Sequence, residues 1–170
     1  MKKFELTSEF VTFLGKTLFR IKALVSFGDV AEGELGGFIE RENNLDQSGD
    51  AWVCGDAQVY GDARVYGDAQ VYGDARVYGD ARVCGDARVC GDARVQNCRD
   101  YSATSCFGSE NRTTTFFRTK DGGISVRCGC FYGTLREFRE KVKERHGDSR
   151  LAKEYLMLAD LMEFRLSKDE

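Results

Sequence analysis

A period of six residues dominates the pattern of apolar and polar positions in the middle of the chain. From Gly49 to Gln96 the sequence reads Gly-Asp-Ala-x-Val-x eight times without interruption, so Ala recurs every six residues from Ala51 and Val from Val53. Alternate side chains of an extended strand share one face. Each repeat therefore predicts a short strand whose Ala and Val face a core and whose middle residue faces outward.

The Gly-Asp pair of each repeat predicts a tight corner. Glycine adopts the backbone conformations that such a corner needs, and the short Asp side chain can bond nearby backbone groups. Three strands and three corners close a triangular coil of 18 residues, and successive coils stack at a strand spacing of about 4.7–4.9 Å. We therefore expect a left-handed parallel β-helix of hexapeptide repeats, with a narrow Ala and Val core that leaves no cavity for a ligand.

Stacking of these coils predicts columns of outward side chains on three faces. Counting by 18 gives Trp52, Gln70 and Arg88 on the first face, Gln58, Arg76 and Arg94 on the second, and Arg64 and Arg82 on the third, with Tyr60 and Tyr78 beside the second column. Guanidinium donors next to flat aromatic rings suit a phosphate-bearing base or a nucleotide. The candidate binding residues are therefore Arg64, Arg76, Arg82 and Arg94, with Tyr60 and Tyr78. The alternative is a solvated surface on which Arg and Asp ladders neutralise each other.

The aspartates of the repeats offer a different interpretation, since regular rows of carboxylates can imitate a nucleic-acid backbone. Five arginines offset the eight aspartates, however, and leave only −3 over the repeats. DNA mimicry is therefore weakly supported. The chain as a whole carries −3, so it lacks the basic surface typical of direct nucleic-acid binding.

Both ends of a β-helix expose unpaired backbone groups and need caps. Upstream, 37–39 and 45–50 have the pattern of degenerate turns separated by Asn43-Asn44, and 9–14 with 17–24 predict a hairpin about Gly15-Lys16. We thus expect a mainly β chain in three parts. These are an N-terminal β cap at 1–36, the β-helix at 37–98, and a module at 99–170 with a β-hairpin and two helices.

The C-terminal module shows its own signals. Residues 113–119 and 124–131 predict a hairpin about a Gly-Gly turn, and Thr134 with Glu137 forms a capping box for a helix that ends at Gly147. A second helix begins near Asp148 or Ser149, and its broad apolar face includes Leu151, Tyr155, Leu158 and Met162. Such a face packs against the β-helix end or a second copy. We expect a homo-oligomer, either a dimer or a trimer.

Composition narrows the class of protein. From the 170-residue sequence we expect neither an apolar leader nor a membrane span, and its seven cysteines indicate reduced thiols. We expect a cytoplasmic protein in a bacterial cell, without cofactor or membrane contact. Cys128-x-Cys130, with Cys98 and Cys106 as a second pair, could bind a metal, but free thiols are the preferred interpretation because the spacing is not that of a zinc knuckle.

Catalytic candidates are few. The single histidine, His146, lies at a predicted helix end, where it interacts favourably with the helix dipole. A three-histidine zinc site is excluded by this count, and no cysteine stands in a recognisable relation to a base. We therefore predict no catalytic residue and no metal.

The segment 27–40, with Gly-Glu-Leu-Gly-Gly at 33–37, leads into the repeats and resembles a family of hexapeptide-repeat proteins common in phages and prophages. The stretch from Cys128-Gly129-Cys130-Phe131 to Tyr155-Leu156 resembles a module found behind such repeats. This resemblance implies a left-handed β-helix. Cellular relatives are often labelled as transferases, and hexapeptide-repeat acyltransferases use a histidine base at a subunit interface and a loop that leaves the helix.

The phage-like resemblance and the missing catalytic set lead to one hypothesis. We expect a non-enzymatic, phage-encoded binding protein that inhibits a bacterial immune system. It would block a defence protein, such as a CRISPR effector, or sequester a signalling nucleotide between subunits. The alternatives are an acyltransferase-like enzyme and a structural rod of β-helices stacked end to end, against which the capped flanks argue.

Overall fold

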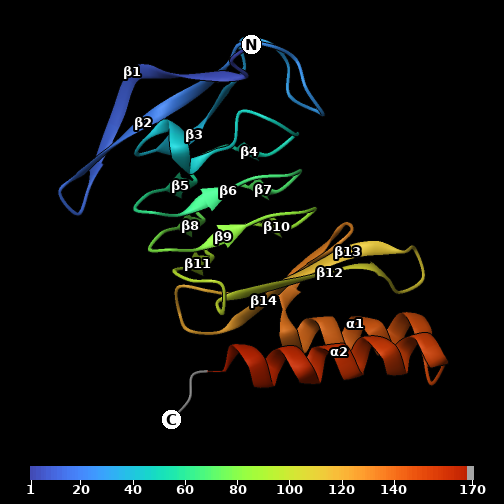
Figure 1. Cartoon of the computed structure of the whole chain (residues 1–170). Coiled ribbons are helices and arrows are strands. Elements are labelled where there is room, and N and C mark those ends of the chain that lie inside the picture. Colours follow the sequence, from blue (N-terminus) through green and yellow to red (C-terminus); the bar gives the residue numbers. More distant parts are fainter. Residues whose placement is uncertain (168–170) are drawn as a thin grey trace.

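The computed structural model describes residues 1–167, and its elements follow one another along a single axis (Figure 1). An N-terminal hairpin lies at one end, a parallel β-solenoid forms the middle, and an antiparallel sheet with two helices forms the other end. One apolar cluster runs from Phe4 in the hairpin through the repeats to Tyr101 and Phe117 in the C-terminal sheet. The solenoid and its two caps therefore share a continuous core.

Each repeat of the solenoid forms one two-residue strand. The strands are β4 (Trp52–Val53), β5 (Gln58–Val59), β6 (Arg64–Val65), β7 (Gln70–Val71), β8 (Arg76–Val77), β9 (Arg82–Val83), β10 (Arg88–Val89) and β11 (Arg94–Val95). Parallel ladders join β4, β7 and β10 on one face, β5, β8 and β11 on the second, and β6 with β9 on the third. The predicted 18-residue coil and its columns are confirmed, because each residue pairs with the one 18 positions further on.

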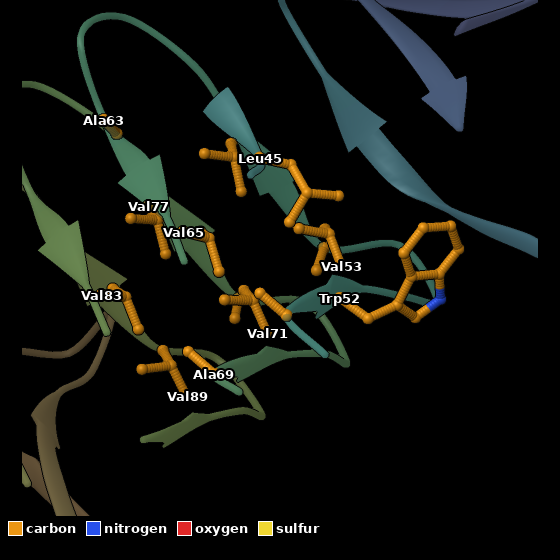
Figure 2. Close-up of a cluster of buried hydrophobic side chains, with 14 of the residues drawn as sticks. Leu45, Trp52, Val53, Ala63, Val65, Ala69, Val71, Val77, Val83 and Val89 are labelled. Carbon is orange, nitrogen blue, oxygen red and sulfur yellow. The ribbon is translucent and has the colours of Figure 1, made fainter. Parts of the chain in front are cut away.

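The core of the solenoid consists of the repeated Ala and Val side chains. All eight of each are 0% exposed, and Figure 2 shows valines from successive coils stacked in the interior. Ile39 and Leu45 continue this core upstream, because β3 (Leu35–Ile39) pairs parallel with β5 and Leu45 pairs with Val65. The two degenerate turns predicted from the sequence are therefore confirmed. Between them, Glu42–Asn44 form a short 3-10 helix at the corner.

Glycine is required at the corners for two reasons. Gly49 has a φ of +67°, a conformation that L side chains rarely adopt, and a Cβ there would lie 2.5 Å from the carbonyl oxygen of Gly67 in the next coil. The close stacking at this corner therefore excludes a side chain at Gly49. Gly85 has a similar φ of +62°, but a Cβ there would meet nothing within 4 Å.

The N-terminal cap is a hairpin of β1 (Phe4–Phe13) and β2 (Lys16–Ala23). β2 pairs antiparallel with β3, so the hairpin extends one face of the solenoid into a six-stranded sheet. The predicted hairpin is confirmed, although its first strand begins earlier, at Phe4. Its turn lies at Leu14-Gly15, both with positive φ, one residue before the predicted Gly15-Lys16.

Trp52 departs from its predicted environment. Its column faces outward, yet the side chain is only 1% exposed. The ring of Phe27 packs edge-on against it with centroids 5.4 Å apart, and Phe4 does so at 6.4 Å. The cap therefore folds over the first face and converts its first outward position into core.

The C-terminal sheet has four strands where the sequence predicts a single hairpin. β12 (Tyr101–Phe107), β13 (Arg112–Arg118), β14 (Ile124–Cys128) and β15 (Phe131–Thr134) pair antiparallel in chain order. β13 and β14 correspond to the predicted hairpin. The predicted strand 124–131 is wrong at its end, because Gly129 with φ +57° turns the chain and Cys128 pairs with Phe131.

The helices α1 (Leu135–His146) and α2 (Arg150–Leu166) cover the side of this sheet away from the solenoid (Figure 1). α1 begins at the predicted Thr134–Glu137 capping box and ends at Gly147, and Ser149 caps α2. Adjacent residues of β13 pack on opposite faces of the sheet. Phe117 belongs to the solenoid core, and Phe116 belongs to the core under the helices. Neither helix of residues 1–167 is long and apolar enough to cross a membrane.

Candidate anion-binding site at the solenoid–sheet junction

The predicted Arg–Tyr face, on strands β5, β8 and β11, supports the N-terminal cap. Tyr60 and Tyr78 stack with ring centroids 5.3 Å apart and ring planes 10° apart, and Tyr60 is 7% exposed beside Leu18 and Phe38. The Arg76 guanidinium lies 4.0 Å above the ring of Phe13. Burial raises the pKa of Tyr60. Phe13 and Leu18 of the N-terminal hairpin therefore cover the part of this predicted surface around Tyr60 and Arg76.

The other predicted arginines have separate environments. The Nη1 of Arg94 donates hydrogen bonds to the carbonyl oxygens of Ala93 at 2.8 Å, Asp74 at 3.0 Å and Asp92 at 3.1 Å, so the backbone holds this guanidinium. Arg64 and Arg82 are paired neighbours on the third face and both are exposed. The structure therefore does not gather the four predicted arginines into one site.

A different set of arginines converges where the solenoid meets the C-terminal sheet. Arg88 of β10, Arg112 of β13 and Arg127 of β14 line a hollow of about 610 Å³, here called the arginine hollow. Its remaining lining residues are Asp86, Asn111, Thr113, Gly129 and Cys130. Three cationic side chains share this hollow with a single carboxylate.

The sheet reaches Arg88 through β13. The backbone N–H of Arg88 donates a hydrogen bond of 3.0 Å to Oγ1 of Thr115. Thr115 pairs with Arg127 across the β13–β14 ladder, and the hydroxyl of Thr113 lies 3.5 Å from Oδ2 of Asp86. Because one face of β13 rests on the last coil, the pairing of two adjacent strands brings Arg127 beside Arg88.

The positive charge of the arginine hollow is weakly compensated. Within residues 1–167, neither Arg88 nor Arg127 forms an ion pair, and Arg112 only approaches Glu110, at 4.0 Å. The Nε of Arg127 is buried without a hydrogen-bond acceptor in the same part of the chain. Buried donors in folded proteins nearly always have a partner, so an orphaned one calls for an explanation such as a bound ion.

A second hollow of about 430 Å³ adjoins the first and shares Asp86, Arg88 and Arg127 with it. It follows the first face of the solenoid, where Asp50, Asp68, Gln70 and Tyr72 line it together with Gly28 and Asp29. Burial, with a hydrogen bond to Cys90, raises the pKa of Tyr72 to about 12, and the positive charges of Arg127 and Arg88 oppose this rise. The two hollows form a surface with a cationic pole and a carboxylate pole.

The predicted oligomerisation residues lie mostly inside the chain. Tyr155, Leu158 and Met162 are 5–8% exposed and pack in the core between the helices and the C-terminal sheet. Leu151 is half-buried. The broad face of α2 is therefore covered by this chain's own sheet and α1, and the exposed apolar side chains of α2 are Met157, Leu161 and Phe164.

Cys128, Cys130 and His146 line one small cavity beside α1, while Cys98 and Cys106 do not line it. Cys128 ends β14 and Cys130 lies in the following turn, so the two thiols do not share one strand, as the predicted strand 124–131 would require. Within residues 1–167, no group of three or more His, Cys, Asp or Glu side chains is arranged to hold a metal ion. His146 is the last residue of α1, as predicted, and its ring stacks on Tyr155 with centroids 5.7 Å apart.

A comparison with known protein families supports the β-solenoid fold that the parallel ladders show. The family model described as YdcK beta solenoid repeat matches residues 57–73 and 69–85, within the middle of the solenoid. A search of curated proteins finds no match. The repeat match and the three parallel ladders together identify the chain as a β-solenoid repeat protein.

Proposed function

We propose that this protein is a non-enzymatic binding protein for a phosphate-bearing small molecule of the nucleotide class. One observation carries the proposal: within residues 1–167, the side chains of Arg88 and Arg127 line one hollow and neither has a carboxylate partner. A guanidinium presents a planar set of donors that matches phosphate oxygens bidentately. A bound phosphate would supply the counter-charge that the described residues do not.

The surroundings favour a ligand larger than a free phosphate. The two adjoining hollows measure about 610 and 430 Å³, within the range of about 300–1,000 Å³ typical of small-molecule sites. Asp50 and Asp68 lie along the second hollow, where they can accept hydrogen bonds from sugar hydroxyls or amino groups. A nucleotide carries both kinds of group, with phosphates at one end and donors at the other.

The scaffold suits binding and sequestration. The backbone of Arg88 is fixed by its bond to Thr115 and by its place in a parallel ladder, so the base of its side chain has a set position at the junction. The hypothesis of a phage-encoded inhibitor of bacterial immunity fits this picture as a biological role. The protein would act in the bacterial cytoplasm and withdraw a signalling nucleotide from a defence system. The phage-like segment at 27–40 supports that role.

Two identical repeats supply a matched test of the site. Residues 79–84 and 85–90 both read Gly-Asp-Ala-Arg-Val-Cys. Both arginines are exposed, but Arg88 lines the arginine hollow and Arg82 lies on the third face. We expect Arg88→Gln to weaken pyrophosphate binding at least tenfold in isothermal titration calorimetry, and Arg82→Gln to leave it within twofold. Equal affinity of the two variants would contradict the proposed site.

The biological role has a separate test. Expression of the protein in bacteria with a nucleotide-signalling defence system is expected to restore phage plating, and Arg88→Gln is expected to abolish the restoration while Arg82→Gln preserves it. Restoration by both variants would remove the arginine hollow from the mechanism. If the unmodified protein and both variants all fail to restore phage plating, the proposed role is contradicted.

A further inference from the structure

Two thiols lie at the tight turn between β14 and β15. Cys128 pairs with Phe131 across the ladder, so Gly129 and Cys130 form a two-residue turn, and Gly129 adopts the positive φ of +57° that such a turn needs. Cα atoms two residues apart at a sharp turn lie about 5–6 Å from each other, within the range of about 4.4–6.8 Å that a disulfide spans. The turn therefore gives the two cysteines the backbone separation that a disulfide requires.

The side chains of both cysteines line the same small cavity, of about 90 Å³, beside α1. Both thiols are free, but their surroundings differ. Cys130 is exposed, whereas Cys128 is half-buried and its Sγ accepts a hydrogen bond of 3.2 Å from Oγ1 of Thr114. A reagent from solution therefore reaches Cys130 first, while the strand and Thr114 hold the second thiol close by.

Positively charged side chains surround the exposed thiol. The guanidinium of Arg112 lies over the turn, because a Cβ on Gly129 would be 3.1 Å from its Nη1. Arg145 lines the small cavity, and Cys130 lines the arginine hollow as well. Arg and Lys side chains outnumber carboxylates in the lining of both. A reagent that carries carboxylates is therefore attracted to Cys130.

We infer that Cys128 and Cys130 form a reversible dithiol–disulfide couple that reacts with anionic low-molecular-weight disulfides. In the first step, the Cys130 thiolate attacks one sulfur of the external disulfide, forms a mixed disulfide and releases one thiolate. In the second step, the Cys128 thiolate attacks Sγ of Cys130, which forms the Cys128–Cys130 bond and releases the other thiolate. Two electrons pass to the external disulfide, and the protons of the two cysteines end on the two released thiols.

The Cys128–Cys130 disulfide is expected to be easily reduced. A bond that closes so short a loop gains little stability from chain entropy, and exposed disulfides are the labile ones. The free thiols are therefore the resting form, and the disulfide forms when oxidised low-molecular-weight thiols accumulate. This chemistry does not require phosphate binding in the arginine hollow, so it goes beyond the proposed function.

Oxidation of the full chain with glutathione disulfide, followed by alkylation, trypsin digestion and mass spectrometry, tests the couple. The tryptic peptide 128–136 contains both cysteines and no other, so the internal disulfide appears as the loss of both thiol hydrogens. We expect this peptide to be oxidised at least tenfold faster than the exposed Cys98 and Cys106 form mixed disulfides. Cys128→Ser is expected to stop at a mixed disulfide on Cys130, while Cys106→Ser leaves oxidation of the peptide within twofold.

The preference for an anionic reagent is tested with cystamine, a cationic disulfide. Arg112→Gln removes the guanidinium that lies over the turn. We expect this variant to react with glutathione disulfide at least threefold more slowly than the unmodified protein, and with cystamine no more slowly. Arg82→Gln, on the third face of the solenoid, is the matched control and is expected to leave both rates within 1.5-fold.

Two results would overturn the dithiol–disulfide couple. In the first, peptide 128–136 stays alkylated at both cysteines while Cys98 and Cys106 react with glutathione disulfide. In the second, Cys128→Ser yields no mixed disulfide at Cys130. Equal slowing of both reagents in Arg112→Gln would overturn the preference for anionic disulfides.

Discussion

The backbone N–H of Arg88 donates a 3.0 Å hydrogen bond to Oγ1 of Thr115, and this bond joins the last coil of the solenoid to the C-terminal sheet. Thr115 is 1% exposed and pairs across the ladder with Arg127. Thr115 therefore contacts the last coil at Arg88 and lies opposite Arg127, the two arginines that line one hollow. Stability of the junction and ligand binding are expected to change together.

Thr115→Val retains the shape of the side chain but removes the acceptor of the Arg88 N–H. A buried donor left without a partner costs about 1–3 kcal/mol, so we expect urea unfolding to show a loss of that size. Thr115→Ser retains the hydroxyl and is the matched control, expected to lose less than half as much. Equal losses in the two variants would show that the hydrogen bond contributes nothing measurable.

The corner glycines provide a second matched pair. Gly85→Ala places a side chain at φ +62° in open space, which costs about 1–2 kcal/mol of backbone strain. Gly49→Ala adds a contact of 2.5 Å with the Gly67 carbonyl oxygen, and overpacking of this kind costs a further 1–3 kcal/mol or so. Chemical denaturation is expected to rank Gly49→Ala as the more destabilised variant. The reverse order would contradict the stacked geometry of the corners.

Lys3 closes the N-terminal end of the solenoid. Its Nζ donates to the carbonyl oxygens of Ala51 at 2.9 Å, Gly49 at 3.2 Å and Ser48 at 3.5 Å, and the side chain is 4% exposed. Lys3→Met leaves these acceptors unpaired, so we expect a loss of about 2–3 kcal/mol in the free energy of unfolding. Lys2→Met is the control, because the contact that Lys2 makes within residues 1–167 is an exposed ion pair with Glu42. A loss as large in Lys2→Met would refute the capping role.

Tyr72 predicts a dependence of stability on alkaline pH. Burial raises its pKa from 10.0 to about 12 in the folded chain, so its contribution is complete below pH 10 and is lost as the pH rises toward 12. One pKa unit corresponds to about 1.4 kcal/mol. Between about pH 8 and pH 11, we expect the unmodified protein to lose roughly 1 kcal/mol more than Tyr72→Phe. Parallel pH profiles of the two proteins in urea unfolding would contradict this expectation.

The solenoid could be predicted from sequence because its information is local and repeated. Each Ala-x-Val unit specifies a strand, each Gly-Asp a corner, and the counting by 18 gives the columns that the ladders confirm. The left-handed sense of the coil stays a prediction. β12 was missed because its sequence, Tyr-Ser-Ala-Thr-Ser-Cys-Phe, has few of the large apolar residues that mark strands, and it gains its place by pairing with β13.

The candidate site was only partly visible in the sequence. Arg88 was placed in an outward column, but its column neighbours are Trp52 and Gln70, so the repeats gave no sign of a cationic cluster. A turn confined to 121–123 would place Gly129 opposite Thr115, whereas in the structure Arg118 pairs with Ile124 and Arg127 lies opposite Thr115. How the sheet docks on the last coil depends on contacts between distant segments, and no local pattern specifies that arrangement.

The most direct test of the anion site observes the guanidinium groups themselves. In ¹⁵N-labelled protein, with the Arg Nε–H signals assigned through Arg→Lys variants, pyrophosphate is titrated while the spectra are recorded. We predict saturable shifts of the Arg127 and Arg88 signals, with the signal of Arg82 unchanged. Shifts of equal size at Arg82, or none at Arg127, would contradict the central claim that the solenoid–sheet junction binds phosphate.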